Sequence, residues 1–284
     1  MAKLSQDSIT QEDIDEFINR DDDFRLEMEV LRRCHELQYE TIHAGSYEDP
    51  ITKKIRQFDI RTFYRHEDFR VYFAIECKNI RENFPLIVSR LPRDITESYH
   101  NLLYIQPTRP TDLIQSNTPQ KLIVVNPSDL YLVGDFIGKS LAQVGRRANQ
   151  GNNQGPIVTA NEEVYDKWSQ ALSSAHDQLK SVYGNYRSGS SSYFAFIPIL
   201  VISDNNLWVA DYNKRGTLIK PAYRAEEVEV FLHRNIYTRT NTIAYTFSYL
   251  HIYTKSRFLK YLGRLPSNIK YWEMIFPSKV LAHP

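Results

Sequence analysis

One stretch, residues 39–79, constrains the fold of this chain more than any other. It holds three β-like runs rich in Ile, Val, Tyr and Phe, joined by short polar turns at 49–52 and 65–68. Links this short favour an antiparallel meander of three strands. Charged residues nevertheless stand inside these apolar runs, with Asp59 in the second and Glu76 in the third. Burying an unpaired charge costs several kcal/mol, so both residues need a partner or a function.

Strand periodicity suggests what that function is. Side chains two apart in a strand share a face, so Glu76 and Lys78 point one way while Cys77 points the other. Asp59 on the neighbouring strand can lie beside them. Two close carboxylates repel unless they share a proton or a cation, and their oxygens suit Mg²⁺ or Mn²⁺. The sequence therefore predicts a metal site on Asp59, Glu76 and the Cys77 backbone carbonyl, with Lys78 orienting a water or stabilising charge on a phosphate.

A purely structural interpretation of the same residues stays open. An acid-x-Lys triplet is a weak signal by itself, although Glu76-Cys77-Lys78 is the only such triplet to end a buried-looking strand. Glu76 can form an ion pair with Lys78, or with Arg61 on the adjacent strand. The residues alone do not separate such an ion pair from a metal site.

The order of these features resembles the PD-(D/E)xK nuclease superfamily. A helix expected over 23–38 precedes a strand, then Asp59 in a second strand and Glu76-Cys77-Lys78 in a third. That superfamily includes type II restriction enzymes, Holliday-junction resolvases and Mrr-like nucleases. The resemblance implies Asp59 and Glu76 as metal ligands, Lys78 as the catalytic lysine, and Mg²⁺ as the cofactor, with Mn²⁺ as a substitute. The chain departs from the motif at Phe58, where the family has Pro.

The resemblance also implies a fourth site residue on the preceding helix. Members of the superfamily often carry an acid there that reaches the metal. Glu27, twelve residues before Tyr39, fits this position as a catalytic residue and metal ligand, and Glu29 is the alternative. An acid in the first turns of a helix is also stabilised simply by the helix dipole, so a solvated structural role for Glu27 stays open.

Beyond residue 160, the pattern predicts elements that can complete such a core. A long amphipathic helix is expected over 161–183. The apolar run 193–203 and the run 207–212 are expected to form two strands joined by a hairpin turn at 204–206. Pro198 indicates a bulge or an edge position for the first of them.

The fold class expected is α/β (α+β): a restriction endonuclease-like core with a mixed central sheet flanked by helices and an insertion after the third strand. Two further helices are expected inside that insertion, over 94–104 and 128–146. The whole chain is expected to form a single nuclease-like domain, divided into a core of 23–79 plus 161–212, an insertion of 80–160, and a C-terminal extension of 213–284 within 1–284.

Composition limits the cellular setting without identifying a partner. The net charge of +1 gives no global attraction to nucleic acid, although residues 214–270 are rich in Lys and Arg. Two cysteines do not make a disulfide framework, so a reducing, cytoplasmic location is expected. The chain has no run of about 20 apolar residues, so no membrane partner is expected.

Taken together, the sequence predicts a Mg²⁺-dependent endonuclease, a hydrolase that cuts phosphodiester bonds in DNA in defence, restriction or DNA repair. RNA as the substrate and exonuclease action stay open, as do a homodimer and a partner defence protein. The alternative prediction is a catalytically inactive nucleic-acid-binding or scaffold protein that retains the nuclease fold.

Overall fold

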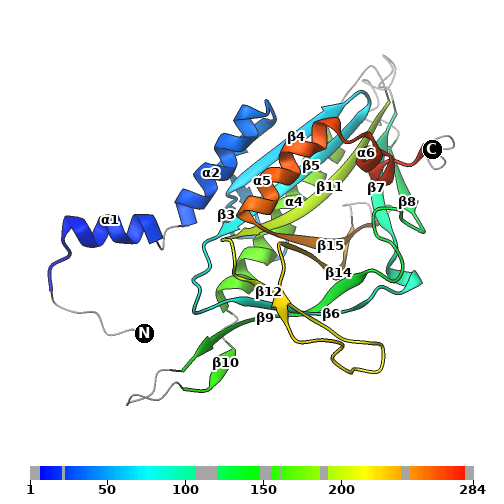
Figure 1. Cartoon of the computed structure of the whole chain (residues 1–284). Coiled ribbons are helices and arrows are strands. Elements are labelled where there is room, and N and C mark those ends of the chain that lie inside the picture. The colour runs from blue at the N-terminus through cyan, green and yellow to red at the C-terminus, as the bar shows by residue number, and fades with distance from the viewer. Residues whose placement is uncertain are drawn as a thin grey trace.

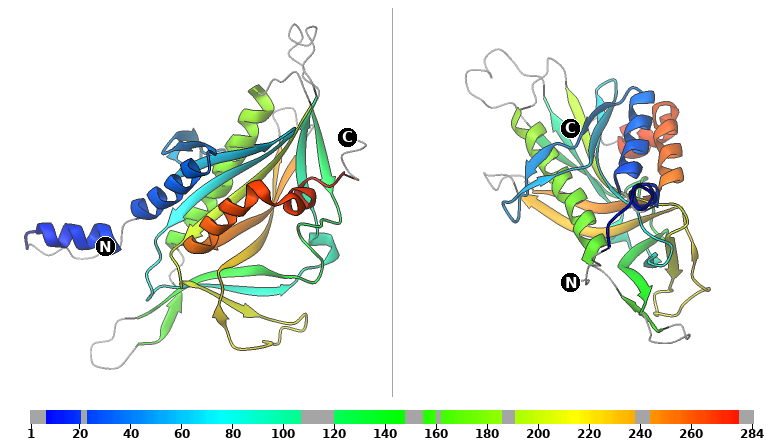
Figure 2. Two further views of the ribbon diagram at one scale, coloured as in Figure 1. Left: turned by 45° about the horizontal axis from the view of Figure 1, so that its top comes forward. Right: turned by 90° about the vertical axis from the view of Figure 1, so that its left-hand side faces the viewer.

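The computed structural model describes residues 7–20, 23–106, 120–147, 155–159, 162–185, 191–237 and 244–278. These residues form a mixed α/β fold in which helices lie on both faces of one large sheet (Figures 1 and 2). The general fold class expected from the sequence is thereby confirmed. Within the described part, no helix is both long and apolar enough to cross a bilayer.

The large sheet joins thirteen strands of the described chain. Its main path runs in the order β1-β4-β5-β11-β15-β14-β9-β6-β12-β13, with β7 and β8 attached through β11 and β10 through β9. Its members are β1 (Glu40–His43), β4 (Ile60–His66), β5 (Phe69–Lys78), β6 (Leu86–Pro92), β7 (His100–Ile105), β8 (Gln120–Val125), β9 (Phe136–Arg146), β10 (Ile157–Thr159), β11 (Ser192–Ile202), β12 (Leu207–Asp211), β13 (Tyr223–Arg224), β14 (Glu227–Tyr237) and β15 (Ala244–Thr254). A separate hairpin pairs β2 (Ser46–Glu48) with β3 (Ile55–Gln57).

The helices cover the two faces of the β5–β11 region (Figures 1 and 2). One face carries α4 (Glu162–Asn185) and the other carries α2 (Asp23–Glu36) and α5 (Lys255–Arg264). The other short helices are α1 (Gln11–Arg20), α6 (Ile269–Ile275) and the 3₁₀ turns η1 (Ile95–Glu97) and η2 (Leu265–Ser267). Strand parity decides which side chains meet which helix: Ala74 packs with α4, while Ile75 and Cys77 pack with α2.

The predicted meander of residues 39–79 is present, with two of its runs interrupted. β1, β4 and β5 pair antiparallel, and Ile60 lies opposite Ile75. The first run breaks into β1 and β2 and the second into β3 and β4, because β2 and β3 form their own hairpin. The Asp49 carboxylate closes that hairpin by accepting hydrogen bonds from the backbone N–H groups of Ile51 and Thr52. Asp59 is thereby placed just before β4 begins.

The expected hairpin between β11 and β12 is wrong. β11 pairs in parallel with β5 on one side and β15 on the other, and β12 pairs in parallel with β6. A strand covered by helices on both faces has an unbroken apolar run, and that run gives no information about the next strand's position. The expected edge position of Pro198 is also wrong: it lies opposite Ala74 of β5 in the sheet interior. Its lack of an N–H is tolerated because β7 pairing ends at Phe194 and β15 pairing begins only at Ile199.

The helices expected over 94–104 and 128–146 are also wrong. Apart from η1 the first region forms the buried strand β7, and the second contains β9. Gly138 and Gly145 of β9 explain why a helix is disfavoured there. A Cβ on Gly138 would lie 2.7 Å from Val88 and 2.9 Å from Val230, so neighbouring strands close directly onto its backbone. Tertiary packing of this kind overrides local helix propensity.

The region proposed as an insertion, 80–160, supplies strands to the same large sheet. β6 lies between β9 and β12, and β7 hydrogen-bonds to β11. Within 80–160, residues 107–119, 148–154 and 160 lie outside the described residues. The segments that are described therefore extend the sheet beyond the core expected from the sequence.

Candidate functional site

Asp59 and Glu76 lie across from each other where β4 begins and β5 ends. The Ile60–Ile75 register places them opposite one another, and Glu76 shares the α4-facing side of β5 with Ala74. Asp59 is 8% exposed and Glu76 is fully buried. The structure thus brings together the two carboxylates predicted as metal ligands.

A lysine that the sequence interpretation missed joins these carboxylates. The Lys167 Nζ atom of α4 lies 3.1 Å from Oδ1 and 2.9 Å from Oδ2 of Asp59, and 3.5 Å from Oε2 of Glu76. Asp59 Oδ2 also accepts a 2.7 Å hydrogen bond from the backbone N–H of Cys77. The only signal in the sequence is that Lys167 stands four residues before the buried Ala171 of α4, which does not by itself mark a lysine as part of a site.

The electrostatics of the three groups follow from their burial. Burial and then the Asp59 charge raise the pKa of Glu76 well above its usual value, and Lys167 offsets this only in part. Burial disfavours the charged form of Lys167, but Asp59 and Glu76 outweigh it and raise the lysine pKa. The arrangement is therefore an Asp59–Lys167 ion pair beside a Glu76 carboxyl whose burial favours the protonated form.

Glu27 lies near this centre, whereas Glu29 does not. Glu27 Oε2 is 3.4 Å from His43 Nε2, and burial followed by the negative charge of Asp59 raises the Glu27 pKa. Glu29 pairs instead with Arg25 at 3.5 Å and Lys255 at 2.8 Å. Of the two acids considered from the sequence, Glu27 is thus the one whose pKa the Asp59 charge raises.

Lys78 is directed to another acid. Its Nζ lies 3.1 Å from Oδ2 of Asp23, whose Oδ1 also accepts a 2.6 Å hydrogen bond from the backbone N–H of Asn79. Asp23 stands in the first turn of α2 and so ties that helix to the end of β5. Cys77 contributes its backbone N–H to Asp59, while its buried thiol faces α2 and has a pKa raised by burial. The cation between the two carboxylates is therefore Lys167, not Lys78.

The donor set fits a magnesium ion better than a metal held wholly by protein. Among the described residues, no three His, Cys, Asp or Glu side chains are arranged to hold a metal. Mg²⁺, however, commonly takes one or two carboxylates and completes its shell with water and phosphate. Asp59 and Glu76 both contact one nitrogen, so they lie near enough to share one cation. Glu76 Oε1 is also buried without a hydrogen-bond partner in the protein, which leaves an oxygen for that cation.

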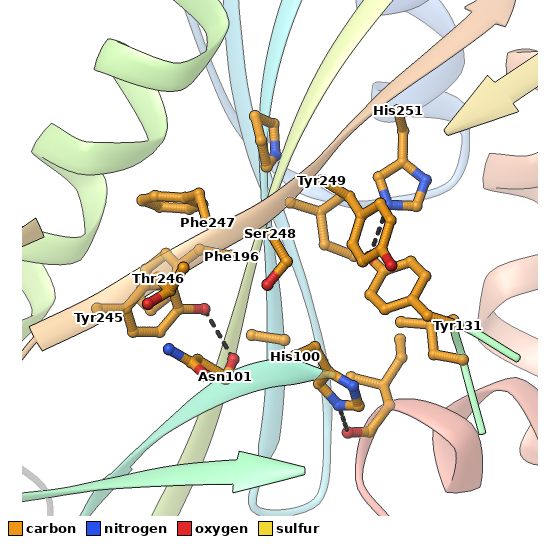
Figure 3. A pocket seen from close by; sticks show the side chains of 15 residues that line it. His100, Asn101, Tyr131, Phe196, Tyr245, Thr246, Phe247, Ser248, Tyr249 and His251 are labelled. Atoms are coloured by element: carbon orange, nitrogen blue, oxygen red, sulfur yellow. Dashed lines mark hydrogen bonds between the residues drawn. The ribbon is translucent and has the colours of Figure 1, made fainter. Parts of the chain in front are cut away.

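A second polar cluster in the interior has a structural character. A cavity of about 30 Å³ lies between β7, β11 and β15 and is lined by His100, His251 and Tyr131 (Figure 3). His251 Nε2 is 2.8 Å from the Tyr131 hydroxyl, and His100 lies between the Ser128 hydroxyl and the Ile275 carbonyl, 2.8 Å from each. Burial lowers the pKa of His100 to about 4 and that of His251 to about 3. These rings are neutral near pH 7, and the cavity holds little more than a water molecule.

Comparison with known proteins does not identify this site. No protein-family model, no curated protein and no solved structure matches the chain. The chemistry of Asp59, Glu76 and Lys167 is therefore the basis for the functional argument.

Proposed function

We propose that this protein is a Mg²⁺-dependent nuclease that hydrolyses phosphodiester bonds, with DNA as the expected substrate. One observation carries the proposal: Asp59, just before β4, and Glu76, on β5, are buried and converge on a single cationic group. One or two carboxylates that reach a single ion are a common way to hold Mg²⁺ beside a phosphate. The resemblance of the 23–79 segment to the PD-(D/E)xK nucleases supports the same reaction.

Each residue has a role that follows from its contacts. The Cys77 N–H fixes the orientation of Asp59, and Asp59 with Glu76 would hold the ion. Mg²⁺, when bound, would supply a more acidic water and offset negative charge on the phosphate. The Lys167 side chain is 20% exposed, and its ammonium group would stabilise negative charge on a phosphate oxygen. Glu27 lies close enough for the Asp59 charge to raise its pKa, after burial.

A second candidate function rests on Lys167 and Lys78. Lys167 already pairs with Asp59 and lies 3.5 Å from Glu76, and Lys78 already pairs with Asp23. If these ion pairs persist with nucleic acid bound, the cluster is a structural element of a protein that binds nucleic acid without cutting it. This is the inactive binding or scaffold protein that the sequence left open.

A cleavage assay separates the two candidates. Purified protein is incubated with single- and double-stranded DNA and RNA, in Mg²⁺ or in EDTA. Under the nuclease proposal, wild type cleaves only with Mg²⁺, and Asp59→Asn and Glu76→Gln each lose at least 100-fold of the rate. Asp211→Asn is the matched control, because Asp211 is 3% exposed and pairs with Arg90 at another strand end. Failure of wild type to cut any of these substrates would overturn the nuclease proposal.

A further inference from the structure

The α4 helix buries polar atoms that no protein group satisfies. Ser173 Oγ and both ring nitrogens of His176 are buried and have no hydrogen-bond partner in the protein. Ser173 is 1% and His176 is 9% exposed. Residues three apart on a helix lie on one face, so these atoms come from the same side of α4. Leaving buried polar groups unsatisfied is costly, which favours a ligand that supplies partners.

An arginine from β14 faces the same helix. Arg234 follows a β-bulge that begins after Phe231, and it pairs across the strands with Phe247. Directly paired residues in an antiparallel sheet project to the same side, and Phe247 belongs to the same buried cluster as Leu172 of α4. Arg234 is therefore on the α4 side of the sheet. Its buried Nη2 atom also has no partner within the protein.

The surroundings of His176 are positive. Burial, and then the charges of Lys180, Arg234 and Lys53, lower the pKa of His176 to about 3. Lys180 and Lys53 are exposed, so their charges act on His176 from the solvent side. Arg234, in contrast, is half-buried and brings its charge to the interior. A group bound here would meet hydrogen-bond donors and positive charge together.

The nearby acid Asp49, which also acts on His176, already has partners. Asp49 accepts hydrogen bonds from the N–H groups of Ile51 and Thr52, and its Oδ2 lies 3.3 Å from Nε of Arg56. Although burial opposes its charged form, these donors lower the net pKa of Asp49. Asp49 also acts on Arg234: burial lowers the Arg234 pKa, and the Asp49 charge raises it. Because the Asp49 carboxylate is shared with Arg56 and two backbone N–H groups, it offsets the Arg234 charge only in part.

We propose that Ser173, His176 and Arg234 form a binding site for a phosphate group, with Lys53 and Lys180 at its solvent side. A compact oxyanion accepts several hydrogen bonds at once and matches the Arg guanidinium in charge and shape. The phosphate can belong to free inorganic phosphate or to a mononucleotide. This site uses none of the residues of the Asp59–Glu76 centre and does not depend on nuclease activity.

The test measures thermal stability of the full chain against increasing phosphate. Inorganic phosphate is compared with chloride at equal ionic strength, and a nucleoside monophosphate forms a second arm. We expect a saturable rise of Tm with phosphate that chloride does not give. In Arg234→Gln the concentration for half-maximal effect rises at least tenfold. The arm with the lower half-maximal concentration identifies the source of the phosphate.

Control variants separate binding from folding. Arg224→Gln removes an exposed arginine of β13 that lies over Trp208, and it should keep the wild-type response. If Arg234→Gln does not fold, Ser173→Ala and His176→Asn replace it, with isothermal titration of phosphate as a second measurement. Equal responses to phosphate and chloride, or a wild-type phosphate response in all of these variants, would overturn the proposal and leave bound water as the partner of the buried atoms.

Discussion

Lys167 and Asp59 form an ion pair in which the lysine Nζ contacts both carboxylate oxygens, at 3.1 and 2.9 Å. The pair joins α4 to the residue just before β4, 108 residues earlier in sequence. Because Nζ also lies 3.5 Å from Glu76, one ammonium group contacts two buried acids. The balance of charge at this centre therefore depends on Lys167.

Replacing Lys167 by Met should destabilise the metal-free protein by about 3 kcal/mol, because it leaves Asp59 as a buried charge without its cation. Mg²⁺ should then stabilise the variant more than it stabilises wild type, since the ion no longer competes with an ammonium group. Urea denaturation of wild type and variant, without Mg²⁺ and at two Mg²⁺ concentrations tenfold apart, measures both effects. A Mg²⁺ response no larger than that of wild type would argue against a shared cation position.

Glu76 should make the protein less stable at higher pH when Mg²⁺ is absent. Its folded-state pKa lies above the ordinary value of 4.5, so the folded state keeps a proton that the unfolded state releases. Stability is then complete below pH 4.5 and falls as the pH rises toward the folded pKa. Glu76→Gln should remove this slope and be more stable than wild type at pH 8. An unchanged slope in Glu76→Gln would mean that Glu76 is ionised in the fold.

The buried histidines should have the opposite effect at lower pH. His100 and His251 have folded pKa values of about 4 and about 3, below the usual 6.5, so the unfolded state takes up protons first. Stability should be complete above pH 6.5 and fall as the pH drops toward 4, by up to about 3 kcal/mol for each ring. Denaturation midpoints of His100→Gln, between pH 4 and 7, should show a shallower slope. His35→Gln, at an exposed position, should reproduce the wild-type slope.

Two glycines of β9 should be intolerant of alanine. A methyl group on Gly138 would meet Val88 and Val230, and one on Gly145 would meet the Phe84 ring. Each substitution should cost about 1–3 kcal/mol, because well-packed neighbours resist an added carbon. Gly184 is the matched control: it lies in α4 with nothing near its missing Cβ, so Gly184→Ala should stabilise by up to about 1 kcal/mol. Thermal denaturation of the three variants distinguishes the two environments.

The local sequence pattern was sufficient to predict an element whose conformation depends on which of its own sides is buried. The 39–79 meander, the α4 helix and the apolar strand β11 were all predicted, because alternation and 3–4 spacing record which side is buried. The same parity placed Asp59 beside Glu76. The turn at 49–52 was predicted from Pro50, which presets a turn backbone.

Pairing partners distant in sequence were not predictable in this way. β7 and β9 were expected to be helices because their strand conformation depends on neighbours such as β11 and β6. The β11–β12 hairpin failed because an apolar strand carries no record of which strand lies next to it. Lys167 was missed because a lone lysine on a helix acquires meaning only when two acids 90 and more residues earlier are known to face it.

The central position of β11 also affects how the chain can acquire its structure during synthesis. β5 is complete by residue 78, yet its parallel neighbour ends at residue 202, and the strand beyond that ends at residue 254. Closing contacts over such sequence separations is slow. A nascent chain released from the ribosome as far as residue 160 has neither β11 nor Lys167, so β5 presents an unpaired edge and Glu76 has no cation. Chaperone binding to ribosome-bound intermediates of this length is therefore the expected fate of the emerging chain.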